Sequence, residues 1–463
     1  RMNLIDASFL YSEDGQSHND VGVVLVFDGP APIREDVMQL IADRIALVPR
    51  FRQKIKHVPY AMALPVWMDD ATFTMRRHVH HNPAPPAPDP LGAAVSQIMS
   101  VPMDLTIPLW ETHLITGLPE DQFALVMRMH HAMVDGVDSI EIIRYLLSDK
   151  PEAEPPVLDT WRARPEVPDA TLIASAFTDA VKDAVNLWTQ IMTKGYKAFP
   201  KMPETLDLSA FMSTSIPLNP MAINGPVRAG RAYAMTEVPF TRLRAIRKLL
   251  GTGTINDVVL SACAYGYTSV INEYLHEQVE NRSIRAMVPV SLHSPDQAGV
   301  TGHNEIGAMV VELPLGTMDP LVRHERIRKQ METFKTLKNA MPADTINPGS
   351  SMASPMTLMM ASRMASSAPV FVNTVISNVP GPQTTLYLDG RRMVRMGACI
   401  SLWTPLKIAI SVMSYDGTVT VSVVTDDASF PKVHVLLDAI QAGLDDIEAA
   451  ARAAATTGAV PGS

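Results

Sequence analysis

The chain has 463 residues, of which 47% are hydrophobic and 19% charged, and its formal net charge is −9. This length exceeds what one hydrophobic core normally organises, so two large domains are expected. The acidic balance argues against nucleic acid as the main partner. The two cysteines, Cys263 and Cys399, lie in separate apolar segments, which argues against a disulfide framework and favours a reducing cytoplasm.

Residues 1–150 are predicted to form an N-terminal domain of mixed α/β structure. The apolar segment 21–29 ends in an Asp-Gly turn and is typical of a buried strand, and residues 33–47 carry apolar side chains at helical spacing. A further strand is predicted at 108–115, before a turn that contains Gly, Pro and Asp.

The most informative segment is residues 130–136, which read His-His-Ala-Met-Val-Asp-Gly. A strand-like run, 123–129, precedes it and a helix-like stretch, 138–147, follows it. An imidazole titrates near neutral pH and is therefore the side chain best suited to accept a proton there. A bare His-His pair is more often a buried structural pair, but the strand–turn–helix setting favours a catalytic site.

Residues 151–230 are predicted to be a linker that crosses between two domains. Polar, proline-rich stretches open it, a helix-like stretch follows at 170–196, and a loop with several prolines closes it. A second α/β domain is predicted at 231–451, before a flexible tail at 452–463. Its predicted strands are 232–239, 285–290, 308–313, 372–377, 407–414 and 418–425. Its predicted helices are 255–277, 318–339 and 430–451.

Four motifs occur in order along the chain. They are Pro-Leu-Trp at 108–110, the histidine motif at 130–136, Asn-Asp-Val-Val-Leu at 256–260 and Ser-Asn-Val-Pro-Gly-Pro at 377–382. Together with the opening Leu-Ile-Asp-Ala-Ser-Phe-Leu at 4–10, they resemble the bacterial wax ester synthase/acyl-CoA:diacylglycerol acyltransferase (WS/DGAT) family. The histidine motif alone would indicate only the CoA-dependent acyltransferase superfamily, which also includes chloramphenicol acetyltransferase and the condensation domains of peptide synthetases.

The resemblance implies two α/β domains of chloramphenicol-acetyltransferase type, with the active site in a tunnel between them. It implies transfer of a long-chain fatty acyl group from acyl-CoA to a lipid alcohol. The acceptor would be diacylglycerol, giving triacylglycerol, or a long-chain fatty alcohol, giving a wax ester. Acyl-CoA would be a substrate, with no permanently bound cofactor and no metal. The expected location is the cytoplasm, with peripheral contact to a membrane or lipid droplet left open.

The resemblance also implies roles for the histidine motif. His131 would be the general base, with His130 beside it, and a thioester needs no Ser or Cys nucleophile because it is already activated. Asp135 would hold the loop by pairing with a distant arginine, for which Arg285 is the candidate; an ordinary strand-end charge is the alternative. Gly136 would permit close approach of the backbone.

The remaining motif residues would contact substrate or line the tunnel. They are Asn256, Asp257, Asn378, Gly381, Pro108, Leu109 and Trp110. For Asn256, a role near the acyl channel or the oxyanion competes with simple capping of a helix. Asn378 would orient a substrate oxygen, with a plain Pro-Gly turn as the alternative. Trp110 is expected to form tunnel wall rather than to react.

Three other signals are set aside. Residues 78–81 read His-Val-His-His and resemble a metal cluster, but no carboxylate or cysteine spacing completes a site there. Gly-Thr-Gly at 251–253 lacks the third glycine of a dinucleotide loop. Cys263 has no basic neighbour and is expected to be an inert core thiol.

Membrane contact and two other functions stay open. No run of 18 apolar residues occurs, so no segment is expected to span a bilayer. The methionines at 352, 356, 359, 360 and 364 form one helical stripe that suits either core or a channel lid, and residues 185–196 could rest on a lipid surface. The alternative functions are a condensation-type acyltransferase that uses a carrier protein, and a non-catalytic lipid-binding protein.

Overall fold

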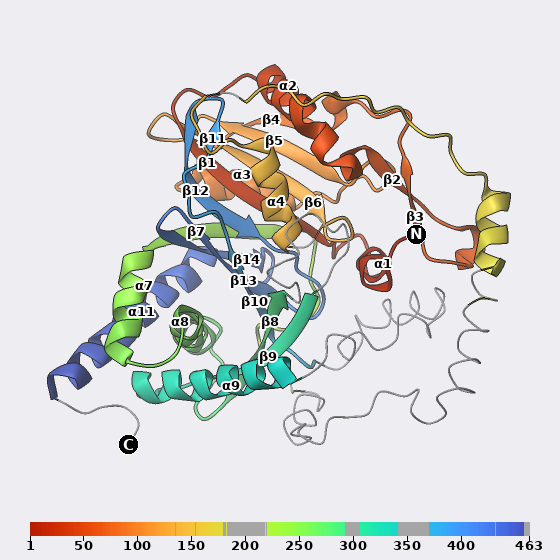
Figure 1. Cartoon of the computed structure of the whole chain (residues 1–463). Helices are drawn as coiled ribbons and strands as arrows, with labels where there is room; N and C mark the ends of the chain where they lie inside the picture. Colours follow the sequence, from red (N-terminus) through yellow and green to blue (C-terminus); the bar gives the residue numbers. More distant parts are fainter. Residues whose placement is uncertain are drawn as a thin grey trace.

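The computed structural model describes residues 1–134, 136–152, 154–178, 182, 218, 220–291, 306–340, 370–430 and 432–457. Two six-stranded mixed sheets form its frame (Figure 1). They meet where β12 (Arg391–Cys399) contacts β13 (Ile408–Tyr415) and β14 (Thr418–Asp426). A small two-stranded sheet pairs β2 (Gln53–Lys56) with β3 (Val66–Asp69).

The first sheet is hydrogen-bonded in the order β11 (Tyr387–Leu388), β12, β1 (Asp20–Asp28), β6 (Gln122–His130), β5 (Trp110–Thr116) and β4 (Val79–Pro83). Neighbouring strands are antiparallel except β4 and β5, which are parallel. The central strands β1 and β6 are covered on both faces, which is why each is an almost continuous apolar run rather than an alternating one. β4 forms one edge of this sheet and pairs only with β5.

The second sheet is hydrogen-bonded in the order β7 (Arg231–Pro239), β14, β13, β10 (Thr374–Pro380), β8 (Ser283–Ser291) and β9 (Ile306–Pro314). β10 is parallel to both β13 and β8, and the other pairs are antiparallel. The carboxyl end of β10 therefore lies at the same edge of the sheet as the carboxyl end of β13.

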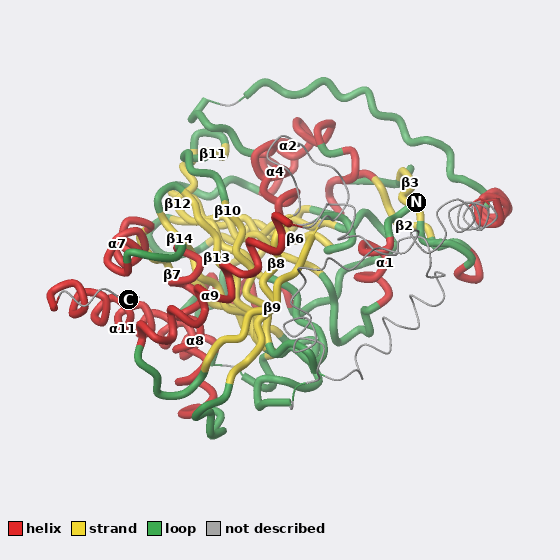
Figure 2. The backbone as a smooth tube through the Cα atoms, turned by 60° about the horizontal axis from the view of Figure 1, so that its bottom comes forward, coloured by secondary structure: helices red, strands yellow, loops and turns green. Residues whose placement is uncertain are grey.

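Helices cover the outer faces, while the strands gather in the middle of the molecule (Figure 2). On the second sheet lie α7 (Phe240–Leu250), α8 (Ile255–Ser269), α9 (Pro320–Ala340) and α11 (Val433–Thr457). On the first sheet or at its end lie α1 (Leu4–Tyr11), α2 (Arg34–Arg44), α3 (Pro90–Met99) and α4 (Gly136–Leu146). Short 3-10 turns occur at Ile45–Leu47, Pro49–Arg52, Pro59–Ala61 and Met75–Arg77.

Three of the four apolar clusters among the described residues pack on or between the two six-stranded sheets. The largest lies between the second sheet and its helices, and another lies between the first sheet, α2 and α4. The third joins the two halves, since Val24 of β1, Tyr233 of β7 and Cys399 of β12 belong to it. Helix α3 contributes to the same junction by packing against β7.

The predicted α/β fold with two sheet-containing parts is confirmed, but the sheets do not follow the order of the chain. β11 and β12, from the C-terminal half, complete the first sheet, and Gly22 of β1 lies opposite Cys399 of β12. The predicted domain boundaries, at residues 150 and 231, stay predictions. The helix predicted at 255–277 is α-helical only as far as Ser269 and continues as a π-helical turn, Val270–Tyr274.

Within the described residues, no helix combines the length and the apolarity needed to cross a membrane. Residues 169–178 are helical, which agrees with the start of the helix predicted at 170–196. The methionine stripe at 352–364, the segment 185–196 and the tail from 458 onward lie outside the described residues.

Candidate active site

The two histidines of the motif lie at the end of β6, between the start of β5 and the segment that leads into β1. The backbone N–H of His130 donates to the carbonyl of Leu109 at 3.0 Å, and that of His131 donates to the carbonyl of Asn19 at 2.7 Å. His130 is fully buried, whereas His131 is partly exposed. The two adjacent imidazoles therefore occupy different environments.

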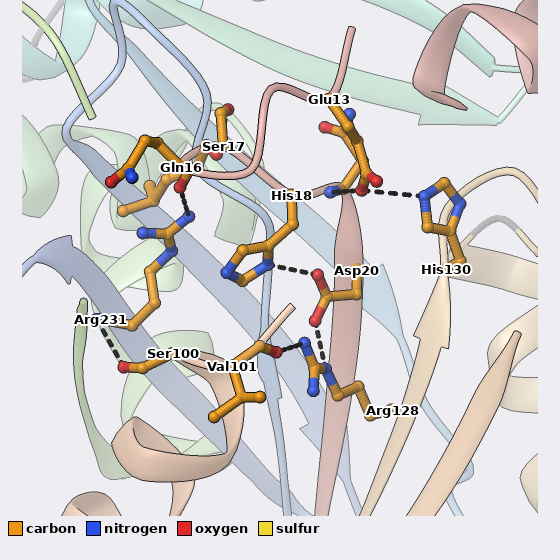
Figure 3. A network of polar contacts seen from close by, with 12 residues as sticks. Glu13, Gln16, Ser17, His18, Asp20, Ser100, Val101, Arg128, His130 and Arg231 are labelled. Carbon is orange, nitrogen blue, oxygen red and sulfur yellow. Dashed lines mark hydrogen bonds and ion pairs between the residues drawn. The ribbon is translucent and has the colours of Figure 1, made fainter. Parts of the chain in front are cut away.

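Both ring nitrogens of His130 are engaged by the protein. Its Nδ1 accepts the N–H of Ala132 at 3.0 Å, so the proton of the neutral ring lies on Nε2. Nε2 donates to Oε1 of Glu13 at 3.0 Å, and the same oxygen accepts the N–H of Asn19 at 2.6 Å (Figure 3). This arrangement fixes the tautomer and orientation of His130, which suits a positioning residue better than a proton acceptor.

His131 stacks on Phe9, with ring centroids 4.1 Å apart and planes 10° from parallel. Phe9 comes from α1, which Asn3 caps by accepting the N–H of Asp6 at 2.7 Å. The side-chain amide of Asn19 donates to the carbonyl of Phe9 at 2.7 Å. The opening motif of the chain thus supplies one wall of the site, a role that the sequence analysis did not assign to it.

A buried charge network lies beside the histidines on β1 and β6 (Figure 3). Nδ1 of His18 lies 2.5 Å from Oδ1 of Asp20, and Nε of Arg128 donates to Oδ2 of Asp20. A second nitrogen of Arg128 donates to the carbonyl of Val101. Burial alone would raise the pKa of Asp20, but the charges of Arg128 and His18 and their hydrogen bonds hold it well below its usual range.

The network continues to β5. Nη1 of Arg128 lies 3.5 Å from Oε2 of Glu111, and the same oxygen lies 3.1 Å from Nε2 of His113. Burial opposes ionisation of Glu111, but the contact with His113 and the charge of Arg128 lower its pKa. These polar side chains join the three adjacent strands β1, β6 and β5. Arg128, which contacts both carboxylates, lies two residues before His130.

The predicted support of the histidine loop is described only in part. Asp135 lies outside the described residues, so its pairing with Arg285 stays a prediction. Gly136 is the first residue of α4. Arg285 is buried on β8, where its Nε lies 3.4 Å from Oε1 of Glu312 and its backbone N–H donates to Oδ1 of Asn373 at 2.8 Å.

Two motif residues from the C-terminal half meet each other. Nδ2 of Asn378, near the end of β10, donates to Oδ1 of Asn256, in the first turn of α8, at 2.9 Å. Gly381 follows β10 closely, where an added Cβ would lie 2.3 Å from the backbone carbonyl oxygen of Ser414. Any side chain at that position would force β10 away from β13.

Asp257 has a local partner rather than one in the other motifs. Its Oδ2 accepts the N–H of Thr254 at 2.7 Å, while the hydroxyl of Thr254 accepts the N–H of Asp257 at 3.4 Å. This reciprocal pair is a capping box at the start of α8. Capping engages Oδ2 of this buried carboxylate and fixes the first turn of α8, which carries Asn256.

Pro108, Leu109 and Trp110 are buried at the start of β5. The indole of Trp110 stacks between Phe51 and His78, at centroid distances of 4.3 and 4.6 Å, and its N–H donates to the carbonyl of Phe51 at 2.8 Å. Trp110 is therefore a core residue here. The predicted role of this motif as tunnel wall stays a prediction.

A cavity of about 240 Å³ lies between α2, α4 and β11. Leu40, Arg44, Leu146 and Tyr387 are among its lining residues, and none of the predicted site residues lines it. The tunnel expected beside His131 stays a prediction. Ligand-type side chains also gather on β4 and β5, where His80, Glu111 and His113 lie together.

Comparison with known families identifies two matching regions. Residues 2–259 match the wax ester synthase/diacylglycerol acyltransferase catalytic domain, and residues 302–448 match the WS/DGAT C-terminal domain. The chain is similar to the probable diacylglycerol O-acyltransferase tgs1 of Mycobacterium tuberculosis H37Rv, with 27% identity over 89% of this chain and 88% of that protein. A putative diacylglycerol O-acyltransferase of the same strain is 29% identical over 97% of this chain and 99% of its own length.

Solved structures share the fold. The wax ester synthase/diacylglycerol acyltransferase from Marinobacter aquaeolei VT8 has a TM-score of 0.66 at 23% identity, covering 97% of this chain and 99% of that one. The TRI3 trichothecene 15-O-acetyltransferase from Fusarium sporotrichioides has a TM-score of 0.63 at 12% identity, covering 96% and 94%.

Proposed function

This chain belongs to the wax ester synthase/diacylglycerol acyltransferase family and is an O-acyltransferase, and we propose that it transfers a long-chain fatty acyl group from acyl-CoA to a lipid alcohol, with His131 as general base. The observation that carries the proposal is the contrast between the two histidines. His130 is fully buried, whereas His131 is partly exposed at the end of β6.

The proposed reaction is a direct displacement. His131 takes the proton of the acceptor hydroxyl as that oxygen attacks the thioester carbonyl, and a tetrahedral oxyanion forms. Its collapse breaks the carbon–sulfur bond, and the imidazolium returns the proton to the CoA thiolate. The products are an ester and free CoA. Holding both substrates at one imidazole lowers the barrier by several kcal/mol, because the encounter becomes effectively unimolecular.

Other residues of the site are assigned positioning roles in this proposal. Glu13, which accepts the N–H of Asn19, holds the His130 ring, and Phe9 holds the plane of the His131 ring. The linked amides of Asn256 and Asn378 would orient a substrate oxygen, since Asn378 is exposed at the end of β10. Asp135 would pair with Arg285 and hold the loop that carries the histidines.

Diacylglycerol is the acceptor that we favour, because the two mycobacterial relatives carry the name diacylglycerol O-acyltransferase. The test is a radiolabelled palmitoyl-CoA assay with diolein and hexadecanol in parallel reactions. Labelled triacylglycerol as the main product would support the proposal, and wax ester as the main product would assign the long-chain alcohol instead. Absence of both products from folded protein would contradict acyl transfer to a lipid alcohol.

Such an acceptor lies in a membrane or a lipid droplet, so we also propose peripheral contact with a lipid surface. Flotation with liposomes that contain diolein is the direct measurement, and failure of the full chain to float at low salt would contradict it. If protein that does not float still esterifies a water-soluble alcohol, acyl transfer is retained and only the contact with a lipid surface is refuted.

A further inference from the structure

Three side chains of ligand type converge on one face of the parallel pair β4 and β5. His80 lies directly opposite His113 in the register, and their rings stack with centroids 4.9 Å apart. Glu111 lies two residues before His113 on the same strand, so its side chain emerges on the same face. One ligand atom from each residue lies within 4.8 Å of the other two.

Both ring nitrogens of His113 lie near side-chain oxygens, and donation from Nδ1 to Asn82 corresponds to the tautomer whose Nε2 lone pair faces Glu111. Nδ1 of His113 lies 3.0 Å from Oδ1 of Asn82, and its Nε2 lies 3.1 Å from Oε2 of Glu111. A neutral imidazole carries one N–H and can donate to only one of these oxygens. The other nitrogen then faces an oxygen lone pair, and a cation between the two groups would turn that repulsion into coordination.

The cluster contains one carboxylate, Glu111, which can serve a cation as an anionic ligand. Arg128 lies 3.5 Å from Glu111, and its Nε is paired with the buried carboxylate of Asp20. The charge of Arg128 is therefore shared between these two carboxylates, and His18 also contacts Asp20. The carboxylate of Glu111 lies beside two imidazoles, of which His113 is buried and His80 is partly exposed.

We propose that His80, Glu111 and His113 bind one divalent cation of zinc type, with water as a fourth ligand. Two imidazoles and one carboxylate form a common three-residue donor set for zinc. Bonds of about 2.0–2.1 Å in a tetrahedral site place neighbouring ligand atoms roughly 3.3 Å apart, so ligand atoms that now lie up to 4.8 Å apart must approach one another by up to about 1.5 Å. Partly exposed His80 can supply that movement by rotation of its side chain.

The ion would act as a structural tie at the edge of the first sheet. β4 is an edge strand, and such strands hold to the sheet on one side only. A ligand from β4 and two from β5 would join the strands independently of their backbone hydrogen bonds.

Residues 78–81 alone do not form this site, since His78 turns to the core, where its Nδ1 lies 2.8 Å from the carbonyl oxygen of Trp110. The carboxylate and the second imidazole come from β5.

The test uses the full chain after treatment with a chelator and buffer exchange. Co²⁺ is titrated into it, and the visible d–d absorption and the unfolding temperature are recorded. We expect a saturable intense band at one equivalent of Co²⁺, and an unfolding temperature several degrees higher than that of the metal-free protein. Zn²⁺ should displace the band.

His80→Ala is the diagnostic variant, and His81→Ala is its matched control. His81 is exposed on the same strand, and its Nε2 lies 2.9 Å from the hydroxyl of Thr116. We expect His80→Ala to weaken Co²⁺ binding at least tenfold and to lose the thermal shift, while His81→Ala keeps both. If His80→Ala does not fold, His80→Gln provides the same comparison with a polar side chain in place.

Two results would overturn the proposal. One is folded wild-type protein that shows neither saturable Co²⁺ absorption nor a thermal shift. The other is equal Co²⁺ affinity in wild-type protein and His80→Ala. Either would make the cluster a hydrogen-bonded network of imidazole and carboxylate side chains without a metal.

Discussion

Oε1 of Glu13 accepts a hydrogen bond from Nε2 of His130 at 3.0 Å, and it joins the segment after α1 to the last residue of β6. His130 is fully buried, so this N–H has no access to bulk water. The contact therefore stabilises the end of β6 and fixes the orientation of the His130 ring.

Removal of the Glu13 side chain should destabilise the protein and slow acyl transfer. Glu13→Ala leaves the buried N–H of His130 without its acceptor, which costs about 1–3 kcal/mol. Glu13→Gln keeps an acceptor oxygen and should lose less than half as much. Urea unfolding measures the free energy, and a Glu13→Ala protein as stable as wild type would show that the contact contributes little.

Replacement of the two histidines should separate chemistry from stability. His131→Ala is expected to lower kcat by roughly 10²–10⁴-fold, the range for loss of a general base, with little change in unfolding temperature because the side chain is partly exposed. His130→Ala should lower the unfolding temperature, because it removes a fully buried ring that holds Glu13 and the N–H of Ala132. Near-normal turnover by folded His131→Ala would refute the assignment of the base.

Asn378→Ala tests the proposed role of the linked amides. The side chain is exposed, so its loss should change stability by no more than about 0.5 kcal/mol. Loss of one hydrogen bond to a substrate oxygen should lower kcat/KM roughly tenfold, which corresponds to about 1.4 kcal/mol. Gln383→Ala is the control, since this exposed amide near Gly381 donates to the carbonyl of Gly381 at 2.9 Å. Equal effects of the two substitutions would argue against a specific role for Asn378.

The buried carboxylate of Asp20 should make the protein sensitive to acid. Its pKa is lower in the folded state than the ordinary value of about 3.9, so below that value the unfolded chain binds more protons than the folded one. The stability that Asp20 contributes is fully present above that pH and is lost as pH falls through the folded value. Urea unfolding from pH 7 down to pH 3 should show a fall in the free energy of unfolding toward the acid end.

Asp20→Asn is the matched variant for this pH dependence. It should flatten the acid slope and lower stability at pH 7, because Arg128 loses its buried counter-charge; breaking a buried pair in this way costs about 3–5 kcal/mol. An unchanged acid slope in Asp20→Asn would assign the titration to other carboxylates, among them Glu111.

Local patterns in the sequence predicted the parts of the structure that depend on near neighbours. The strand β6, the following turn and the start of α4 were all indicated by periodicity around residues 130–136. The sequence allowed helix capping as a role for Asn256, and the structure shows Thr254 as the cap, whose hydroxyl accepts the N–H of Asp257 three residues away. Asp257 illustrates the limit, since its motif suggested substrate contact, which stays a prediction, and only the structure shows that its carboxylate completes that cap.

Residue patterns along the chain therefore suffice to predict the α/β class and to locate the histidine motif after a strand, because alternation and helical spacing report which face of an element is buried. The folded arrangement was needed to show that Glu13 holds His130, that Asn378 meets Asn256, and that β12 completes the sheet of β1. These contacts join segments far apart along the chain. A side chain's chemistry shows that it needs a partner, but strand pairing decides which distant residue that partner is.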